Sequence, residues 1–206
     1  MRRTFVISDW FYRLTHAVKR NRAAVVIYAL VFLLFLIIGI AVGVNIGDKT
    51  AYIMRNRSPV FAYLRGSSGF AAFFFLELLS TSVYCLFALG LFFKRPLSFL
   101  SIAPCMYKSY SLGMQVSVIV ILFSAPSLPM LFVFFVPISI IEIAILCMLS
   151  FKCIAFAALN GRCSPSKPDI KAYFYSATPY FIAIAVCTFI KVMTVALFGS
   201  ALIGVI

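Results

Sequence analysis

The stretch from residue 128 to residue 159 reads LPMLFVFFVPISIIEIAILCMLSFKCIAFAAL, and it decides the fold. A helix that crosses a lipid bilayer needs about 20 mostly apolar residues, and this stretch exceeds that length. It contains Pro137, which removes a backbone hydrogen-bond donor and kinks or breaks a helix. The sequence therefore predicts a proline-broken or re-entrant membrane segment, with a half-helix over 130–136, a break at Pro137 and a full helix to about Leu159.

Glu142 follows five residues after this proline and has apolar neighbours on both sides. A carboxylate at the centre of a membrane helix costs about 2.5–3.5 kcal/mol on insertion scales, and a partner inside the bundle normally offsets that cost. Two interpretations stay open. Either Glu142 belongs to a working centre, or Pro137 shapes the helix and Glu142 is a structural ion-pair partner.

The composition extends the membrane interpretation to the whole chain of 206 residues, of which 64% are hydrophobic. Soluble domains are about 45–50% apolar. The sequence predicts an all-α, polytopic transmembrane helical bundle: residues 1–22 form a basic, amphipathic cytoplasmic segment and residues 23–206 form the transmembrane domain. The net charge of +13 lies beside apolar spans, so we expect anionic lipid as its partner and no nucleic acid.

Hydropathy predicts about five spans, over residues 23–44, 69–93, 97–123, 128–159 and 172–198. With the N-terminus inside the cell, most of the basic residues fall on the inner side. The outer side then holds only Lys49, Arg55, Arg57 and Arg65. Because cytoplasmic loops are enriched in Lys and Arg, this asymmetry favours a cytoplasmic N-terminus and an external C-terminus.

Three glycines at intervals of four, Gly39, Gly43 and Gly47, end the first span. Residues four apart share a helix face, and small residues there let another backbone approach closely. The spacing predicts a packing face, used within the chain or toward a partner, including a second copy in an oligomer. Residues 47–68 then form a predicted outer loop, whose arginines are either a partner surface or merely solvated.

Four charged residues fall inside predicted spans: Glu77, Lys108, Glu142 and Lys191. Counting along each span at about 1.5 Å per residue places them at two matched levels. We therefore predict two buried ion pairs, Glu142 with Lys108 and Glu77 with Lys191. Breaking a buried pair typically costs about 3–5 kcal/mol, whereas replacing both partners by apolar residues is often neutral.

The motifs of common enzyme classes are missing from the sequence. There is no phosphate-binding G-x-x-x-x-G-K-[ST] loop, no H-E-x-x-H, and no G-x-S-x-G. The aspartates lie outside the predicted spans, and the six cysteines form no Cys-x-x-Cys pair and resemble small buried hydrophobes. We expect no enzymatic activity, no cofactor and no metal site.

The order of these features resembles the stage II sporulation protein M superfamily of bacterial membrane proteins. The resemblance covers nearly the whole chain: IIGIAVGVNIGD ends the first span, LGLFFKRPLSFL joins the second and third, and MYKSYSLGMQVSVIVILF supplies an internal lysine and glycine. The best match is FVFFVPISIIEIAILCMLSFK, which resembles the family's proline-broken helix with an acid a few residues later. The abundant Phe and Cys residues and the basic outer loop depart from the family's pattern.

The resemblance implies a non-enzymatic scaffold or anchor in the bacterial cytoplasmic membrane, of the kind that holds peptidoglycan hydrolases there during engulfment of the forespore. A broader superfamily role outside sporulation is equally open. The alternative is a transporter or permease subunit in which the intramembrane charges serve a substrate or proton path, since broken helices are common in transporters.

Overall fold

A computed structural model describes residues 22–57, 62–63, 66, 68–91, 95–122, 135–159 and 167–203. Every regular element in these ranges is a helix, and no strand occurs among them. The helices are α2 (Arg22–Arg57), α4 (Phe70–Gly90), α5 (Arg95–Ser98), η2 (Phe99–Ile102), α6 (Ala103–Leu122), α8 (Val136–Leu159) and α9 (Lys167–Ile203). The predicted all-α class is therefore confirmed, whereas the basic segment 1–21 lies outside the described residues.

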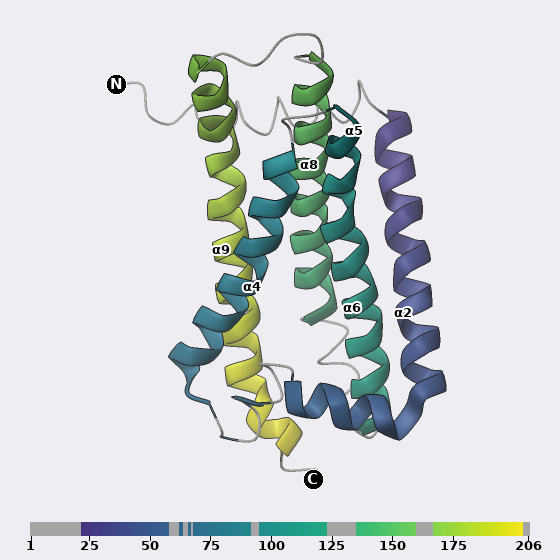
Figure 1. Ribbon diagram of the computed structural model, residues 1–206. Coiled ribbons are helices and arrows are strands. Elements are labelled where there is room, and N and C mark those ends of the chain that lie inside the picture. Colours follow the sequence, from purple (N-terminus) through teal and green to yellow (C-terminus); the bar gives the residue numbers. More distant parts are fainter. Residues whose placement is uncertain are drawn as a thin grey trace.

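In the described residues, four helices are long and apolar enough to cross a membrane, which is compatible with a multi-pass membrane protein. The qualifying segments are Val25–Asn45, Phe70–Gly90, Val136–Ala158 and Asp169–Leu197. α6 is a fifth long helix in the described part of the chain; it packs against α2, α4 and α8 and carries Lys108 and Gln115 (Figure 1). Along the chain, the five long helices alternate in direction, so that α2, α6 and α9 run one way and α4 and α8 the other (Figure 1).

The described part of α2 extends well beyond the predicted end of the first span. Hydropathy predicts that the span ends at Val44 and that a loop begins at Gly47, whereas the helix continues to Arg57. The polarity of the sequence after Gly47 led to the prediction of a loop, yet the segment has no proline and remains compatible with a helix. In Figure 1 the last part of α2, drawn in blue, turns and runs across one end of the bundle.

Pro137 lies in the first turn of α8. The missing backbone N–H of a proline is tolerated there, because the first N–H groups of a helix have no partner within the helix. In the described residues Pro137 thus stands at a helix start, and the predicted half-helix before it falls largely on residues 130–134, outside the described ranges. α8 begins part-way along the bundle and rises to the end where α9 starts (Figure 1).

α9 is longer than the predicted fifth span, since it begins at Lys167 instead of residue 172 and continues to Ile203. Pro168 and Asp169 occupy its first turn, where proline is favoured and an acid interacts well with the positive end of the helix dipole. The sequence before residue 172 was predicted as loop because it is polar. Its residues are in fact those of a helix N-terminus.

The core lies between α4, α6, α8 and α9. Its largest cluster of buried side chains comprises Cys85, Ala88, Leu89, Cys105, Leu146, Leu149, Cys153, Tyr173, Ala177 and Ile184. Three of the cysteines belong to this cluster, and all of the described cysteines are free thiols, which agrees with their predicted role as small hydrophobes. α2 stands outside this core and packs along α6 (Figure 1).

Candidate functional site: a buried charge cluster

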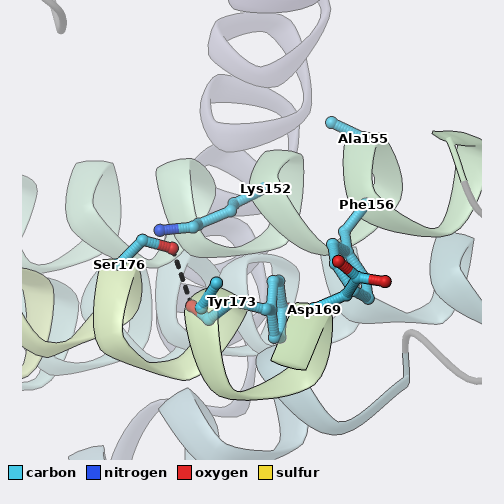
Figure 2. A pocket seen from close by; sticks show the side chains of 7 residues that line it. Lys152, Ala155, Phe156, Asp169, Tyr173 and Ser176 are labelled. Atoms are coloured by element: carbon cyan, nitrogen blue, oxygen red, sulfur yellow. Dashed lines mark hydrogen bonds between the residues drawn. The ribbon is translucent and has the colours of Figure 1, made fainter. Parts of the chain in front are cut away.

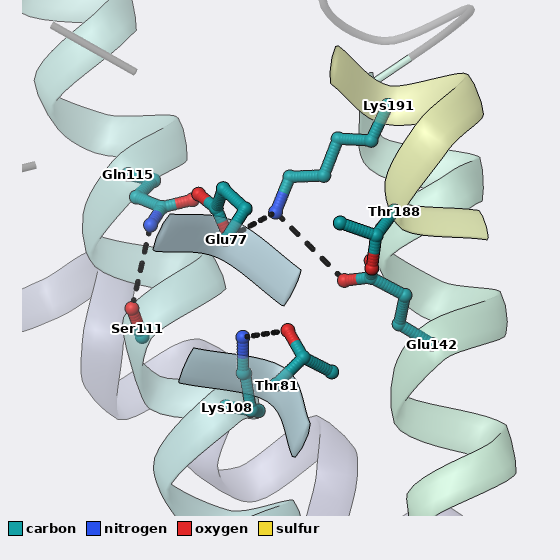
Figure 3. Close-up of polar contacts among 8 residues, drawn as sticks. All are labelled: Glu77, Thr81, Lys108, Ser111, Gln115, Glu142, Thr188 and Lys191. Carbon is teal, nitrogen blue, oxygen red and sulfur yellow. Dashed lines mark hydrogen bonds and ion pairs between the residues drawn. The ribbon is translucent and has the colours of Figure 1, made fainter. Parts of the chain in front are cut away.

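Lys191 of α9 sits between two carboxylates that come from different helices. Its Nζ lies 3.7 Å from Oε2 of Glu77 on α4 and 3.8 Å from Oε2 of Glu142 on α8. The three residues are only 4%, 6% and 3% exposed, in the order Lys191, Glu77, Glu142. Figure 3 shows the lysine reaching into the space between the two acids. One ammonium group thus links three helices in the interior of the bundle.

The structure brings Glu77 and Lys191 together, as the depth count predicts, but the predicted direct pair of Glu142 with Lys108 is wrong. Glu142 pairs with Lys191 instead, and the Nζ of Lys108 donates a hydrogen bond to Oγ1 of Thr81 at 3.2 Å. No carboxylate among the described side chains forms an ion pair with Lys108. Depth along a span fixes the level of a side chain, whereas the rotation of each helix decides which neighbour it meets.

Lys108 nevertheless balances the charge of the cluster. Lys191 alone would leave one excess negative charge on the two acids, and Lys108 makes the set neutral. Thr81, which holds it, lies one helical turn after Glu77 on the same face of α4. The Nζ of Lys108 also lies 5.2 Å from the centre of the Tyr84 ring, a cation–π contact. Glu77, Glu142 and Lys191 are buried and Lys108 is partly buried, and mutual neutralisation reduces the free-energy cost of placing these charges inside the protein.

Two further side chains complete the surroundings of the ion pairs. The hydroxyl of Thr188 donates a hydrogen bond to Oε1 of Glu142 at 3.3 Å. Glu142 is therefore bound by two side chains of α9, Thr188 and Lys191. The ring of Phe135, just before α8, lies 5.1 Å from the Nζ of Lys191. The buried hydroxyl of Ser139 has no hydrogen-bond partner within the described parts of the chain. Sequence reasoning missed both threonines, although each lies three or four residues from a buried charge and hence on the same helix face.

The predicted glycine face lies against α6. A Cβ atom added to Gly39 would collide with the backbone carbonyl oxygen of Tyr110 and lie 3.2 Å from Cα of Gly113. One added to Gly43 would collide with Oγ of Ser117. Between Val25 and Asn45 these two glycines are the only buried residues. They therefore bring two backbones together within this chain; the side-chain environment of Gly47 lies outside the described part.

The predicted outer partner surface is only partly within the described chain. Arg55 and Arg57 belong to the last turn of α2, while Arg65 lies outside the described residues. The structure therefore does not bring these three arginines into a described site.

The cluster holds charge in place, because one ammonium group lies between two carboxylates from different helices. Each acid of the cluster is paired with a cation, and no group of three or more His, Cys, Asp or Glu side chains with metal-binding geometry occurs in the described ranges.

Comparisons with protein families, with curated proteins and with solved structures find no match. The interpretation of function therefore depends on the geometry of this chain.

Proposed function

We propose that this chain is a non-enzymatic, multi-pass membrane protein that acts as a scaffold, with its intramembrane charges serving to hold the bundle together. The observation that carries the proposal is the position of Lys191, 3.7 Å from Glu77 and 3.8 Å from Glu142 in the protein interior. An ammonium group shared by two acids is a structural link between helices. Polar contacts of this kind help to hold helices together in a bilayer, where apolar surface provides no driving force.

The scaffold has five spans in this proposal, with the N-terminus in the cytoplasm and the C-terminus outside. The alternating direction of the five long helices supports this topology, and so does the predicted excess of basic residues on the inner side. The fifth span is α6, whose polar residues Ser109 and Ser117 are buried within the bundle instead of facing lipid. A cysteine-accessibility map in a cysteine-free background tests it. Labelling of position 56 from the cytoplasm, or of position 164 from outside, would overturn the topology.

The partners we propose are membrane-associated cell-wall hydrolases at the bacterial cytoplasmic membrane. This step rests on the resemblance of the motif order to the stage II sporulation protein M superfamily. In-cell cross-linking followed by purification tests it directly. We expect the wild-type chain to recover a peptidoglycan amidase or a lytic transglycosylase. A variant with the arginines of residues 47–68 replaced by Gln should not recover it. Recovery of unrelated proteins only would contradict the assignment.

The second candidate, a transporter or permease subunit, is favoured by two observations. Among the residues that the structure describes, the buried hydroxyl of Ser139 has no hydrogen-bond partner, and the ammonium group of Lys108 is held by a neutral hydroxyl instead of a carboxylate. Both could serve a polar path. A neutral variant that combines Glu77→Gln, Glu142→Gln, Lys108→Met and Lys191→Met separates the two functions. A scaffold keeps its captured partners in this variant, whereas a transporter folds but loses uptake or efflux.

A further inference from the structure

A groove between α8 and α9 lies away from the charge cluster, at the end of the bundle where α8 finishes and α9 begins. It has a volume of about 590 Å³ and is lined by Lys152, Ala155, Phe156, Asp169, Ala172, Tyr173 and Ser176 (Figure 2). Volumes of this size are typical of sites for small organic ligands. The lining combines an aromatic and alanine wall with a few polar groups, which suits a ligand that is apolar at one end and charged at the other.

The wall of this groove is fixed by contacts that do not involve a ligand. The rings of Phe156 and Tyr173 lie 4.4 Å apart between centroids, and the Tyr173 hydroxyl donates to the backbone oxygen of Leu89 on α4 at 3.2 Å. The hydroxyl of Ser176 donates to the backbone oxygen of Tyr173 at 2.7 Å, so its own oxygen still faces the groove as an acceptor (Figure 2). The wall is therefore preformed.

Lys152 supplies the charge. It is half-buried in α8, its Nζ lies 5.4 Å from the centre of the Tyr180 ring, and no carboxylate among the described side chains forms an ion pair with it. An ammonium group has three donors and no acceptor, so a tyrosine ring leaves donors available for an anion. Figure 2 shows the Nζ on the Ser176 side of the groove and the Asp169 carboxylate on the Phe156 side.

The depth of the groove matches the boundary between lipid headgroups and acyl chains. Lys152 lies six residues before Ala158, the last residue of one candidate span, which is about 9 Å at about 1.5 Å per residue. Asp169 is the first residue of the next candidate span. Ala172 and Ser176 are exposed on the outside of the bundle, so the groove opens sideways, toward lipid in a membrane.

We propose that this groove binds one glycerophospholipid of the inner leaflet, with the phosphate on Lys152 and an acyl chain along Phe156, Tyr173 and Ala172. Basic pockets between membrane helices on the cytoplasmic side bind lipid headgroups in this manner. The inference uses the membrane setting of the proposed function, and it is independent of the scaffold role.

Native mass spectrometry of the purified full chain in detergent tests the proposal. The probes are a phosphatidylglycerol, a phosphatidylethanolamine and a diacylglycerol with the same acyl chains. Both phospholipids are expected to bind, and Lys152→Gln is expected to weaken them about tenfold, the loss that follows removal of a charged hydrogen bond. The matched control is Lys171→Gln, because this exposed lysine near the Tyr175 ring lies outside the groove and should not affect binding.

A second variant fills the groove and leaves the charge of Lys152 unchanged. Ala172→Trp is expected to reduce phospholipid binding as strongly as Lys152→Gln, because the bulky side chain occupies the apolar wall from its exposed side. Diacylglycerol should bind weakly to every form, and inorganic phosphate should not displace the phospholipid. Equal binding of diacylglycerol and phospholipid, or full binding by both variants, would overturn the proposal, and neither result would affect the capture of protein partners.

Discussion

Two helix contacts in this molecule are built in opposite ways. α2 meets α6 through Gly39, Gly43 and Gly113, where missing side chains allow the backbones to touch. α4, α6, α8 and α9 converge instead on four charged side chains, with Lys191 at the centre. The first contact involves no described charge, and the second brings together two carboxylates and two ammonium groups.

The difference shows how helices associate when apolar burial contributes little. Lipid tails are as apolar as leucine, so membrane helices associate through close packing or through polar contacts. The glycine contact depends on the close approach of two backbones, so an added side-chain atom should disrupt it. The charge cluster depends on equal numbers of positive and negative charges, so replacing all of its charged residues together by neutral ones should be tolerated. The two contacts should therefore respond differently to substitution.

The largest effect is expected from Lys191→Met, which leaves two buried carboxylates without their shared cation. Loss of one partner of a buried pair typically costs about 3–5 kcal/mol, and here two acids lose it. The measurement is the free energy of unfolding in detergent, by steric trapping or denaturant titration. Adding Glu77→Gln, Glu142→Gln and Lys108→Met to this variant removes all four charges and should recover much of the loss. If this quadruple variant is no more stable than Lys191→Met, the cluster is not held by charge balance.

The second largest effect is expected at the glycine contact, where an added methyl group would collide with the backbone at Gly39 and with a side chain at Gly43. Gly39→Ala places a methyl group against the Tyr110 backbone oxygen, which cannot retreat without moving the helix, and we expect a loss of about 1–3 kcal/mol. In Gly43→Ala the added methyl group collides with the side chain of Ser117, whose Cβ would lie 2.9 Å from it. Adding Ser117→Gly removes that side chain and should restore stability. Stability of Gly39→Ala at the wild-type level would mean that α2 and α6 do not touch.

The third and smallest effect concerns Thr188. Thr188→Val removes the hydroxyl that donates to Glu142, and the net contribution of such a hydrogen bond is about 0.5–1.5 kcal/mol. Thr178→Val is the matched control, because Thr178 is exposed on the same helix and its hydroxyl bonds only to the backbone oxygen of Phe174. Equal stability of the two variants would show that the Thr188 hydroxyl does not support the carboxylate.

The sequence identified the charged residues of the cluster and one of its pairs, because a charge in an apolar run is conspicuous and helical rise is constant. It failed for the partner of Glu142, for two reasons. The candidate span on α8 begins at Val136, whereas hydropathy predicted a start at residue 128, so the depth of Glu142 was counted from the wrong residue. Counted from Val136, Glu142 lies six residues in, and Lys191 likewise lies six residues from Leu197, the end of the candidate span on α9. In addition, hydropathy does not determine the rotation of a helix that is apolar on every side.

Glycine spacing predicted which face of α2 packs, since Gly39, Gly43 and Gly47 share one helix face and the first two lie against α6. It did not predict the partner. The partner surface on α6 contains Gly113 and Ser117, four residues apart, so a second small-residue pair was present in the sequence as an unused signal. The start of α9 was likewise missed because Pro168 and Asp169 were assigned to a loop, although both are favoured in a first helical turn.

The most direct test of the central claim is a pair of double-mutant cycles on unfolding free energy. One combines Lys191→Met with Glu142→Gln, and the other combines Lys108→Met with Glu142→Gln. Contacting residues show coupling of about 0.5–3 kcal/mol, so the first cycle should give a coupling in this range and clearly exceed the second. A larger coupling between Lys108 and Glu142 would contradict the account, because Lys191 would then not be the cation that the two acids share.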